Sequence, residues 1–241
     1  MQDQNKMKII ILAGGLGTRL SELTKTIPKP MVLINGKPLI VRIMSHFAKY
    51  GFKNFYIATG YKSKIIKKYF EKKNKKWNVK LINTGKNTMT GGRLKRLKKY
   101  IGNETFFLTY GDGLSNVNLK KLINFHKRKK NLVTVTAVRP PARFGVLNIS
   151  GDLVDHFGEK EHTDSGWING GFFVLEPEVS QFIESELEPF EIGALPKLTK
   201  ISKLAAFQHE GFWQPMDTLR EKMDLAKFAL EIPPPWLNQI S

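Results

Sequence analysis

The 241-residue sequence contains no cysteine, which excludes disulfide bonds, thiolate metal sites and a cysteine nucleophile. Its five histidines show no metal-ligand spacing such as His-x-x-x-His. No apolar run approaches the roughly 20 residues that span a bilayer, and residues 1–6 lack the apolar core of a signal peptide. These absences predict a soluble cytoplasmic protein with no membrane partner, in which any metal is bound by oxygen.

Acidic residues are scarce in the first 130 residues, where 5 Asp and Glu stand against 30 Lys and Arg, a net charge of +25. Residues 131–241 carry 9 basic and 16 acidic side chains, a net charge of −7. Clustered Lys and Arg favour polyphosphate or nucleic acid. Lysine-rich solvated helix faces explain the same charge, and we adopt that interpretation for residues 72–76 and 127–130. No nucleic-acid partner is therefore expected.

What the sequence does contain is a bulky apolar run that ends in glycines, Ile9-Ile10-Ile11-Leu12-Ala13-Gly14-Gly15-Leu16-Gly17-Thr18-Arg19-Leu20. Such a run predicts a buried strand that leads into a tight loop, where backbone amides can approach an anion. The P-loop spacing is absent, and the dinucleotide fingerprint needs a glycine where this chain has Leu20. A purely structural turn is the alternative, and the basic residues Arg19 and Lys29 favour a phosphate loop.

Lys29 lies between Pro28 and Pro30. Because Ile27 and Lys29 each precede a proline, we expect extended backbone at both. A lysine on such a stiff segment beside a glycine loop can serve as a fixed positive charge for phosphate. The alternative is a surface lysine in a proline-rich turn.

Strand and helix patterns alternate along the chain, which predicts an α/β fold. An amphipathic helix begins after Pro38 and ends near Gly51. Further strands are expected over residues 54–59, 77–83, 105–110, 133–138 and 204–207, and helices over 63–70, 118–128, 177–185 and 219–230. A hairpin is expected over 144–149 and 153–157. Residues 233–236 are expected to form a tail on the surface.

Two further loops follow predicted strands. Residues 83–93 are polar, contain Gly91 and Gly92, and exceed the usual 2–6-residue connection, so we predict a second ligand loop. Asp112 lies between two glycines at the end of strand 105–110, and open parallel sheets gather their ligands at the carboxyl ends of strands. This position favours an Mg²⁺ ligand, although Asp-Gly is also a common turn pair.

Together these motifs resemble the sugar-nucleotide pyrophosphorylases, over about residues 7–226. Residues 12–20 with Pro28-Lys29-Pro30 match the signature of that family, and residues 87–93, 110–113, 167–175 and 211–219 are similar to its cytidylyl branch. The resemblance implies one domain over residues 1–241, a Rossmann-like doubly wound sheet, mixed but mostly parallel, with a small β-rich sugar-binding insertion. It also implies a nucleotide-binding half (about 7–138), a sugar-phosphate-binding half (about 139–230) and a tail (231–241).

The reaction implied by the resemblance joins CTP to α-D-glucose 1-phosphate and gives CDP-glucose and pyrophosphate, with Mg²⁺. The implied nucleotide-binding residues of the glycine loop are Leu12, Ala13, Gly14, Gly15, Leu16, Gly17 and Thr18. Arg19 is implied to bind the β- and γ-phosphates and Lys29 the α-phosphate. The residues implied near the base and ribose are Thr88, Arg93 and Gly111. The implied Mg²⁺ ligands are Asp112 and Asp217. The implied sugar-phosphate residues are Gly145, Glu159, Lys160 and Asn169.

The sequence departs from the family pattern at Glu161, where the family usually has proline, and at Gly193, where it tends to have glutamate. The choice of sugar therefore stays open. A thymidylyl- or uridylyltransferase is one alternative, disfavoured because residues 87–92 replace the Gln-Pro-x-Gly-Leu-Ala stretch of those relatives. A non-catalytic regulatory or RNA-binding protein is another, disfavoured because both carboxylates and both phosphate-binding cations are present. A homo-oligomer is left open.

Overall fold

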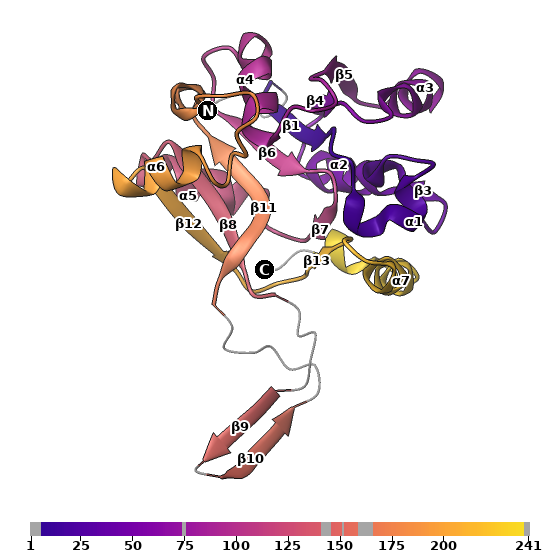
Figure 1. Ribbon diagram of the computed structural model, residues 1–241, viewed down its shortest axis with the longest axis vertical. Helices are drawn as coiled ribbons and strands as arrows, with labels where there is room; N and C mark the ends of the chain where they lie inside the picture. Colours follow the sequence, from indigo (N-terminus) through magenta and orange to yellow (C-terminus); the bar gives the residue numbers. More distant parts are fainter. Residues whose placement is uncertain (1–5, 74–75, 141–145, 151, 159–165, 239–241) are drawn as a thin grey trace.

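The computed structural model describes residues 6–73, 76–140, 146–150, 152–158 and 166–238. A seven-stranded sheet forms its centre, with the strands in the order β12 (Leu204–His209), β8 (Val133–Val138), β11 (Ile168–Leu175), β6 (Phe106–Tyr110), β1 (Lys8–Ala13), β4 (Asn54–Thr59) and β5 (Asn78–Asn83) (Figure 1). Only β11 runs antiparallel to its neighbours in this sheet, β6 and β8. The expected α/β fold with a mixed, mostly parallel sheet is confirmed.

Alternation along β1 divides its side chains between two apolar cores, one on each face of the sheet. Ile9 and Ile11 pack in one core, and Ile10 and Leu12 in the other. The first core also takes side chains from α2 (Leu39–Lys49), α3 (Ser63–Lys73), α5 (Leu119–Lys129) and α7 (Leu219–Phe228). The second takes side chains from α4 (Thr90–Ile101), the 3₁₀ helix η3 (Pro177–Phe182) and α6 (Ala194–Lys200). The molecule therefore has three layers.

Shorter elements lie outside the main sheet. The segment after β1 contains η1 (Thr18–Leu20), α1 (Ser21–Thr24), η2 (Lys29–Met31) and the small pair β2 (Leu33–Ile34) and β3 (Lys37–Pro38). A second small pair joins β7 (Gly113–Ser115) to β13 (Trp213–Pro215). The expected hairpin is present as β9 (Val146–Ser150) and β10 (Leu153–Gly158), away from the sheet in Figure 1.

Two expectations about elements are wrong. The helix expected over residues 177–185 is the short 3₁₀ helix η3, and Ile183 after it is extended. The tail expected on the surface instead forms η4 (Pro235–Leu237) and buries Trp236 at 1% exposure in the first core. The Trp236 ring lies 5.2 Å from the Arg42 guanidinium of α2. Burial of so large an aromatic ring stabilises the packing of this proline-rich segment against the core.

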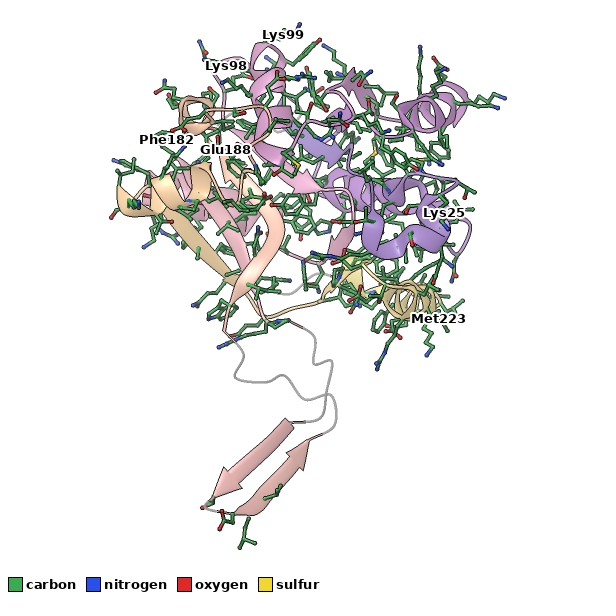
Figure 2. All side chains as sticks on the ribbon, in the orientation of Figure 1. Lys25, Lys98, Lys99, Phe182, Glu188 and Met223 are labelled. Atoms are coloured by element: carbon green, nitrogen blue, oxygen red, sulfur yellow. The ribbon has the colours of Figure 1, made fainter. Side chains whose placement is uncertain are left out.

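Several lysine side chains lie on the exposed faces of the helices. Figure 2 shows Lys98 and Lys99 pointing outward near the end of α4, away from the carboxyl ends of the strands. No helix among the described residues is long and apolar enough to cross a membrane.

Candidate functional site

The glycine loop leaves the sheet at the carboxyl end of β1, beside the end of β6. From β1 the chain continues to β4 on one side of β1 and later returns to β6 on its other side. The carboxyl ends of β1 and β6 therefore flank a switch point of the sheet. A pocket with about 700 Å³ of empty volume opens there. Its lining includes the predicted residues Leu12, Ala13, Gly14, Gly15, Gly17, Lys29, Thr88, Arg93, Gly111 and Asp112.

Two carboxylates that are distant in the sequence meet at Lys29, which lines this pocket. Asp112 directly precedes β7 and Asp217 follows β13, and these strands pair so that Gly113 lies opposite Pro215. The Met216 N–H donates to the Asp112 carbonyl at 2.8 Å and ties the two strand ends together. Asp217 is not the cap of α7, because Thr218 caps that helix and forms a capping box with Glu221.

The predicted cations converge on these carboxylates. Lys29 Nζ donates to Asp112 at 2.8 Å and to Asp217 at 2.5 Å. Arg19 donates to the other oxygen of Asp217 at 3.0 Å, with 77% of its own side chain exposed. Charges of both signs thus lie together at the edge of the glycine loop, where a polyphosphate and a cation would both find partners.

The pKa values reflect this arrangement. Burial disfavours the charged form of Lys29, but attraction and hydrogen bonding from Asp112 and Asp217 outweigh it and raise the pKa of Lys29 above 10.5. Burial likewise opposes ionisation of Asp217, yet hydrogen bonding and attraction from Lys29, then from Arg19, hold the pKa of Asp217 below 3.8. Lys29 is therefore a buried ammonium and Asp217 an ionised carboxylate at neutral pH.

The expected extended backbone at Lys29 is wrong. Pro28 is extended, but Lys29 begins the 3₁₀ helix η2. Hydrogen bonds from Met31 N to the Pro28 carbonyl at 2.8 Å and from Val32 N to the Lys29 carbonyl at 3.1 Å stabilise this turn against the preference that Pro30 imposes. The turn places the Lys29 side chain inward, with only 8% of the residue exposed.

Arg93 lines the pocket from α4, but its guanidinium serves the protein itself. It donates to the carbonyl of Gly14 at 2.9 Å, to that of Gly85 at 2.8 Å and to the hydroxyl of Thr84 at 2.7 Å. A Cβ on Gly14 would lie 2.1 Å from this guanidinium, so the first glycine of the loop makes room for Arg93. Arg93 thus holds the glycine loop against the segment after β5, and its predicted contact with base or ribose stays a prediction.

In the second predicted ligand loop, residues 83–93, the glycines permit close packing against another segment of the chain. A Cβ on Gly92 would lie 2.1 Å from the carbonyl oxygen of Glu186, and the Gly91 N–H donates to the Glu188 carbonyl at 3.1 Å. The glycines therefore let the segment 186–190 pack directly on the start of α4. Thr88, which precedes them, lines the larger pocket, and its contact with base or ribose stays a prediction.

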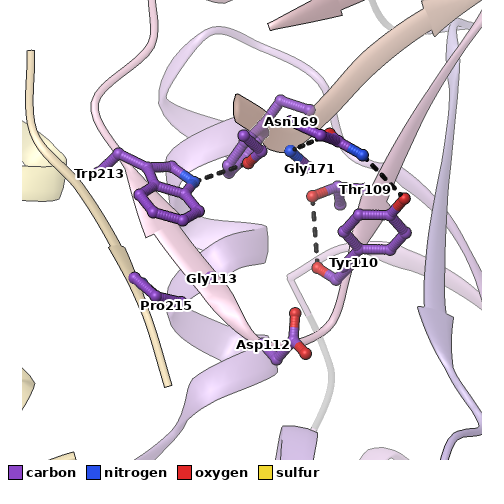
Figure 3. Close-up of a pocket in the computed structure, with 10 residues that line it drawn as sticks. Thr109, Tyr110, Asp112, Gly113, Asn169, Gly171, Trp213 and Pro215 are labelled. Carbon is purple, nitrogen blue, oxygen red and sulfur yellow. Dashed lines mark hydrogen bonds between the residues drawn. The ribbon is translucent and has the colours of Figure 1, made fainter. Parts of the chain in front are cut away.

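A smaller pocket, with about 270 Å³ of empty volume, lies between β6, β7, β11 and β13 (Figure 3). Asn169 of β11 lines it, together with Asp112, Tyr110 and Trp213. Trp213 Nε1 donates to the Gly170 carbonyl at 2.7 Å and closes one side. The other predicted sugar-phosphate residues, Gly145, Glu159 and Lys160, lie outside the described residues.

The geometry allows a test of whether the predicted metal ligands fit Mg²⁺. Both carboxylates contact the Lys29 ammonium, and Asp217 also contacts Arg19, so one oxygen donor of each carboxylate is directed at the same point. Within the described ranges, no group of three or more His, Asp or Glu side chains could hold a metal. Mg²⁺ is commonly held by one or two carboxylates, with substrate phosphates and water completing its ligands. Asp112 and Asp217 fit a metal of that kind.

Comparison with known proteins decides the family. The family model described as nucleotidyl transferase matches residues 8–229. The chain belongs to this family. The matched range holds the glycine loop, both carboxylates and both pockets of this nucleotidyl transferase.

Relatives with names and structures are similar over nearly the whole chain. The glucose-1-phosphate cytidylyltransferase of Salmonella typhi is 44% identical, over 95% of this chain and 98% of the relative. The probable glucose-1-phosphate cytidylyltransferase of Bacillus subtilis is 40% identical, over 92% and 95%. The crystal structure of HddC from Yersinia pseudotuberculosis is 30% identical and superposes with a TM-score of 0.74, over 92% of this chain and 98% of that one.

Proposed function

We propose that this chain is a glucose-1-phosphate cytidylyltransferase, which makes CDP-glucose and pyrophosphate from CTP and α-D-glucose 1-phosphate. The observation that carries the proposal is the 44% identity with the Salmonella typhi enzyme over 95% of the chain. The convergence of Lys29, Arg19 and two carboxylates beside the glycine loop supports the reaction class, because both substrates are anionic and must be brought together.

In the proposed reaction, a phosphate oxygen of glucose 1-phosphate attacks the α-phosphorus of CTP. A new bond forms between that oxygen and the α-phosphorus, and the bond from the α-phosphorus to the oxygen of the β-phosphate breaks, so pyrophosphate leaves. The reaction needs no side-chain nucleophile, and the protein contributes position and charge. Residues 7–138 supply the nucleotide side and residues 139–230 the sugar side.

Each cation has a proposed task. Backbone amides of residues 14–18 and the guanidinium of Arg19 bind the β- and γ-phosphates. The Lys29 ammonium, buried and held by two carboxylates, binds the α-phosphate as negative charge shifts there. Asp112 and Asp217 would hold Mg²⁺, which would neutralise phosphate charge.

On the sugar side, Asn169 faces the sugar hydroxyls of glucose 1-phosphate from β11. Gly145, Glu159 and Lys160 complete this side of the proposal. Thr88 and Arg93, with Gly111, form the base and ribose side of the larger pocket.

Pyrophosphate release tests the proposal directly. CTP, UTP, dTTP and ATP are compared with Mg²⁺ and glucose 1-phosphate, and CTP is then compared with other sugar 1-phosphates. Preference for CTP with glucose 1-phosphate is the expected result. Preference for UTP or dTTP would replace the proposal by the thymidylyl or uridylyl alternative. No release with any pair, together with tight and steeply salt-dependent RNA binding, would indicate a regulatory protein.

A further inference from the structure

Tyr110, the last residue of β6, lines both pockets. Its ring packs edge-on against Phe173, with the ring centroids 5.8 Å apart. On another side the ring meets Gly171, whose φ is +78° and where a Cβ would lie 2.7 Å from Tyr110 Cδ2. The ring is thus held in place, and its hydroxyl with it.

The hydroxyl of Tyr110 joins a short chain of hydrogen bonds, which we name the Tyr110 relay and which consists of Thr90, Glu191, Tyr110 and Asn169. Tyr110 donates to Oε1 of Glu191 and accepts from Nδ2 of Asn169 at 3.3 Å (Figure 3 shows the contact with Asn169). The other oxygen of Glu191 accepts from the Thr90 hydroxyl at 2.7 Å. The relay therefore runs from the first residue of α4, at the nucleotide pocket, to β11, at the smaller pocket.

The chemistry of the groups fixes the direction of every bond in the relay. Both oxygens of Glu191 accept hydrogen bonds, one from Tyr110 and one from Thr90, so the single proton of the Tyr110 hydroxyl points to Glu191. Burial and the negative charge of Glu191 raise the pKa of Tyr110, which keeps that proton in place. The lone pairs of the hydroxyl then face Asn169 and require its NH₂ group.

The orientation of the Asn169 amide is confirmed from its other end, where Oδ1 accepts from the Gly171 N–H at 2.8 Å. An amide NH₂ has two N–H groups, and Tyr110 takes one. The second N–H is the one that a ligand in the smaller pocket can use. An amide turned by 180° would offer an acceptor at that point instead of a donor.

We propose that Tyr110 and Glu191 are positioning residues, which fix the Asn169 amide so that an N–H donates to a hydroxyl oxygen of the sugar phosphate. The inference rests on the proposed function, because it assigns the smaller pocket to the sugar 1-phosphate. Neither residue needs to touch the sugar. Together with the Gly171 N–H, they fix whether the Asn169 amide presents a donor or an acceptor to the sugar, and so discriminate among sugars.

Two variants change the relay in different ways. Tyr110→Phe removes the hydroxyl and keeps the ring. Glu191→Gln keeps the size, but its amide can donate to the Tyr110 oxygen, which turns the Tyr110 proton toward Asn169 and favours the reversed amide. We expect each variant to raise KM for glucose 1-phosphate about five- to tenfold, as the loss of one hydrogen bond does, with KM for CTP within about twofold of the wild type.

Control variants make the same two substitutions elsewhere in the protein. Tyr100→Phe removes a tyrosine hydroxyl from α4, and Glu186→Gln neutralises an exposed carboxylate that pairs with Arg96. Both are expected to keep the wild-type KM for glucose 1-phosphate. Melting temperatures of all four variants report whether the fold is retained.

A panel of monodeoxy glucose 1-phosphates separates positioning from a general structural role. Wild type is expected to prefer glucose 1-phosphate to the compound that lacks the hydroxyl bound by Asn169, and both relay variants to lose that preference. An equal rise of KM for every sugar phosphate, or no change of KM in either variant, would overturn the inference. If wild type prefers another sugar 1-phosphate, the proposed function fails, and the relay is tested with the deoxy series of that sugar. If it releases no pyrophosphate, calorimetric binding of the same sugar phosphates replaces KM.

Discussion

Asp112 and Asp217 are the residues on which the proposed chemistry depends most, since each places a carboxylate oxygen within 2.8 Å of Lys29 Nζ. Asparagine keeps the shape of aspartate and removes its charge. We expect Asp112→Asn and Asp217→Asn each to lower kcat by about 100-fold or more, because charge neutralisation by a metal is worth several kcal/mol. Pyrophosphate release measures the loss, and an unchanged circular dichroism spectrum shows that the fold persists. Normal turnover in either variant removes that residue from the metal site.

Lys29 is buried between these carboxylates, and its proposed partner is the α-phosphate at which charge changes during the reaction. We expect Lys29→Ala to lower kcat by a larger factor than it raises KM for CTP, because an interaction made mainly in the transition state appears in kcat. Steady-state kinetics with CTP varied at saturating glucose 1-phosphate measure both effects. The reverse pattern would mean that Lys29 binds substrate and transition state equally.

Single residues of the candidate site differed in how far the sequence could predict them. Asp112 stood out because it lies between glycines after a strand. Its meeting with Asp217 depends on the pairing of β7 with β13, which two three-residue strands do not reveal in a sequence. Tyr110 and Glu191 were missed, because a tyrosine at a strand end and a glutamate in an irregular segment have no spacing that links them. The signals were that residues 110–113 are similar to the cytidylyl branch and that Gly193, two residues after Glu191, departs from the family pattern.

Gly92 shows how the start of α4 depends on a segment from the other end of the chain. A methyl group there would meet the Glu186 backbone, which cannot move as a side-chain tip can. We expect Gly92→Ala to lower the free energy of unfolding by about 1–3 kcal/mol, the usual cost of overpacking. Gly166→Ala is the matched control, because nothing lies within 4 Å of its Cβ position. Urea denaturation compares the two, and equal stability would show that residues 186–190 give way.

His46 of α2 gives the fold a pH dependence. Burial lowers the pKa of His46 from 6.5 to about 4, and the neutral ring contacts the Val117 carbonyl at 3.0 Å. Below pH 6.5 the unfolded chain binds a proton at this position that the folded chain does not. The free energy of unfolding should therefore fall between pH 6.5 and about 4, by at most about 1.4 kcal/mol per pH unit from this group.

His46→Gln tests this expectation, because glutamine can donate to the same carbonyl and does not titrate. Urea denaturation from pH 8 to pH 4 should show a shallower decline in the variant than in the wild type. Parallel declines across that window would mean that His46 is protonated in the folded protein as well.

Helices and strands were predictable where a regular spacing of apolar residues, or a residue that ends a helix, marked them in the sequence. The strand over 133–138 and the helix that follows Pro38 came out as expected, because alternation and three-to-four spacing are local properties. The prediction was wrong at η3 and at the tail. In both places long-range packing decides: Val179 of η3 and Trp236 of η4 each fill a core that the local sequence does not show.

Charge is a property of the whole molecule, with a net +18 that arises from the first 130 residues. Both proposed substrates are anions, so this field should speed their encounter with the site. We expect kcat/KM for CTP to fall several-fold between about 0.02 and 0.5 M salt, with a smaller change in kcat, because salt screens long-range attraction. The double variant Lys98→Glu, Lys99→Glu changes the last turn of α4, whose first turn lines the larger pocket, and should flatten this dependence. Equal salt dependence in both proteins would mean that only charges within the site contribute.

The pairing of β7 with β13 also means that the site is completed late in synthesis of the chain. The ribosome makes Lys29 early, and Asp217 follows 188 residues later. At about 5–20 residues per second, that delay lasts from roughly ten to forty seconds. During that interval the nascent chain holds the glycine loop and then Asp112 but lacks the second carboxylate. Synthesis itself therefore postpones the proposed chemistry until nearly all of the domain has emerged.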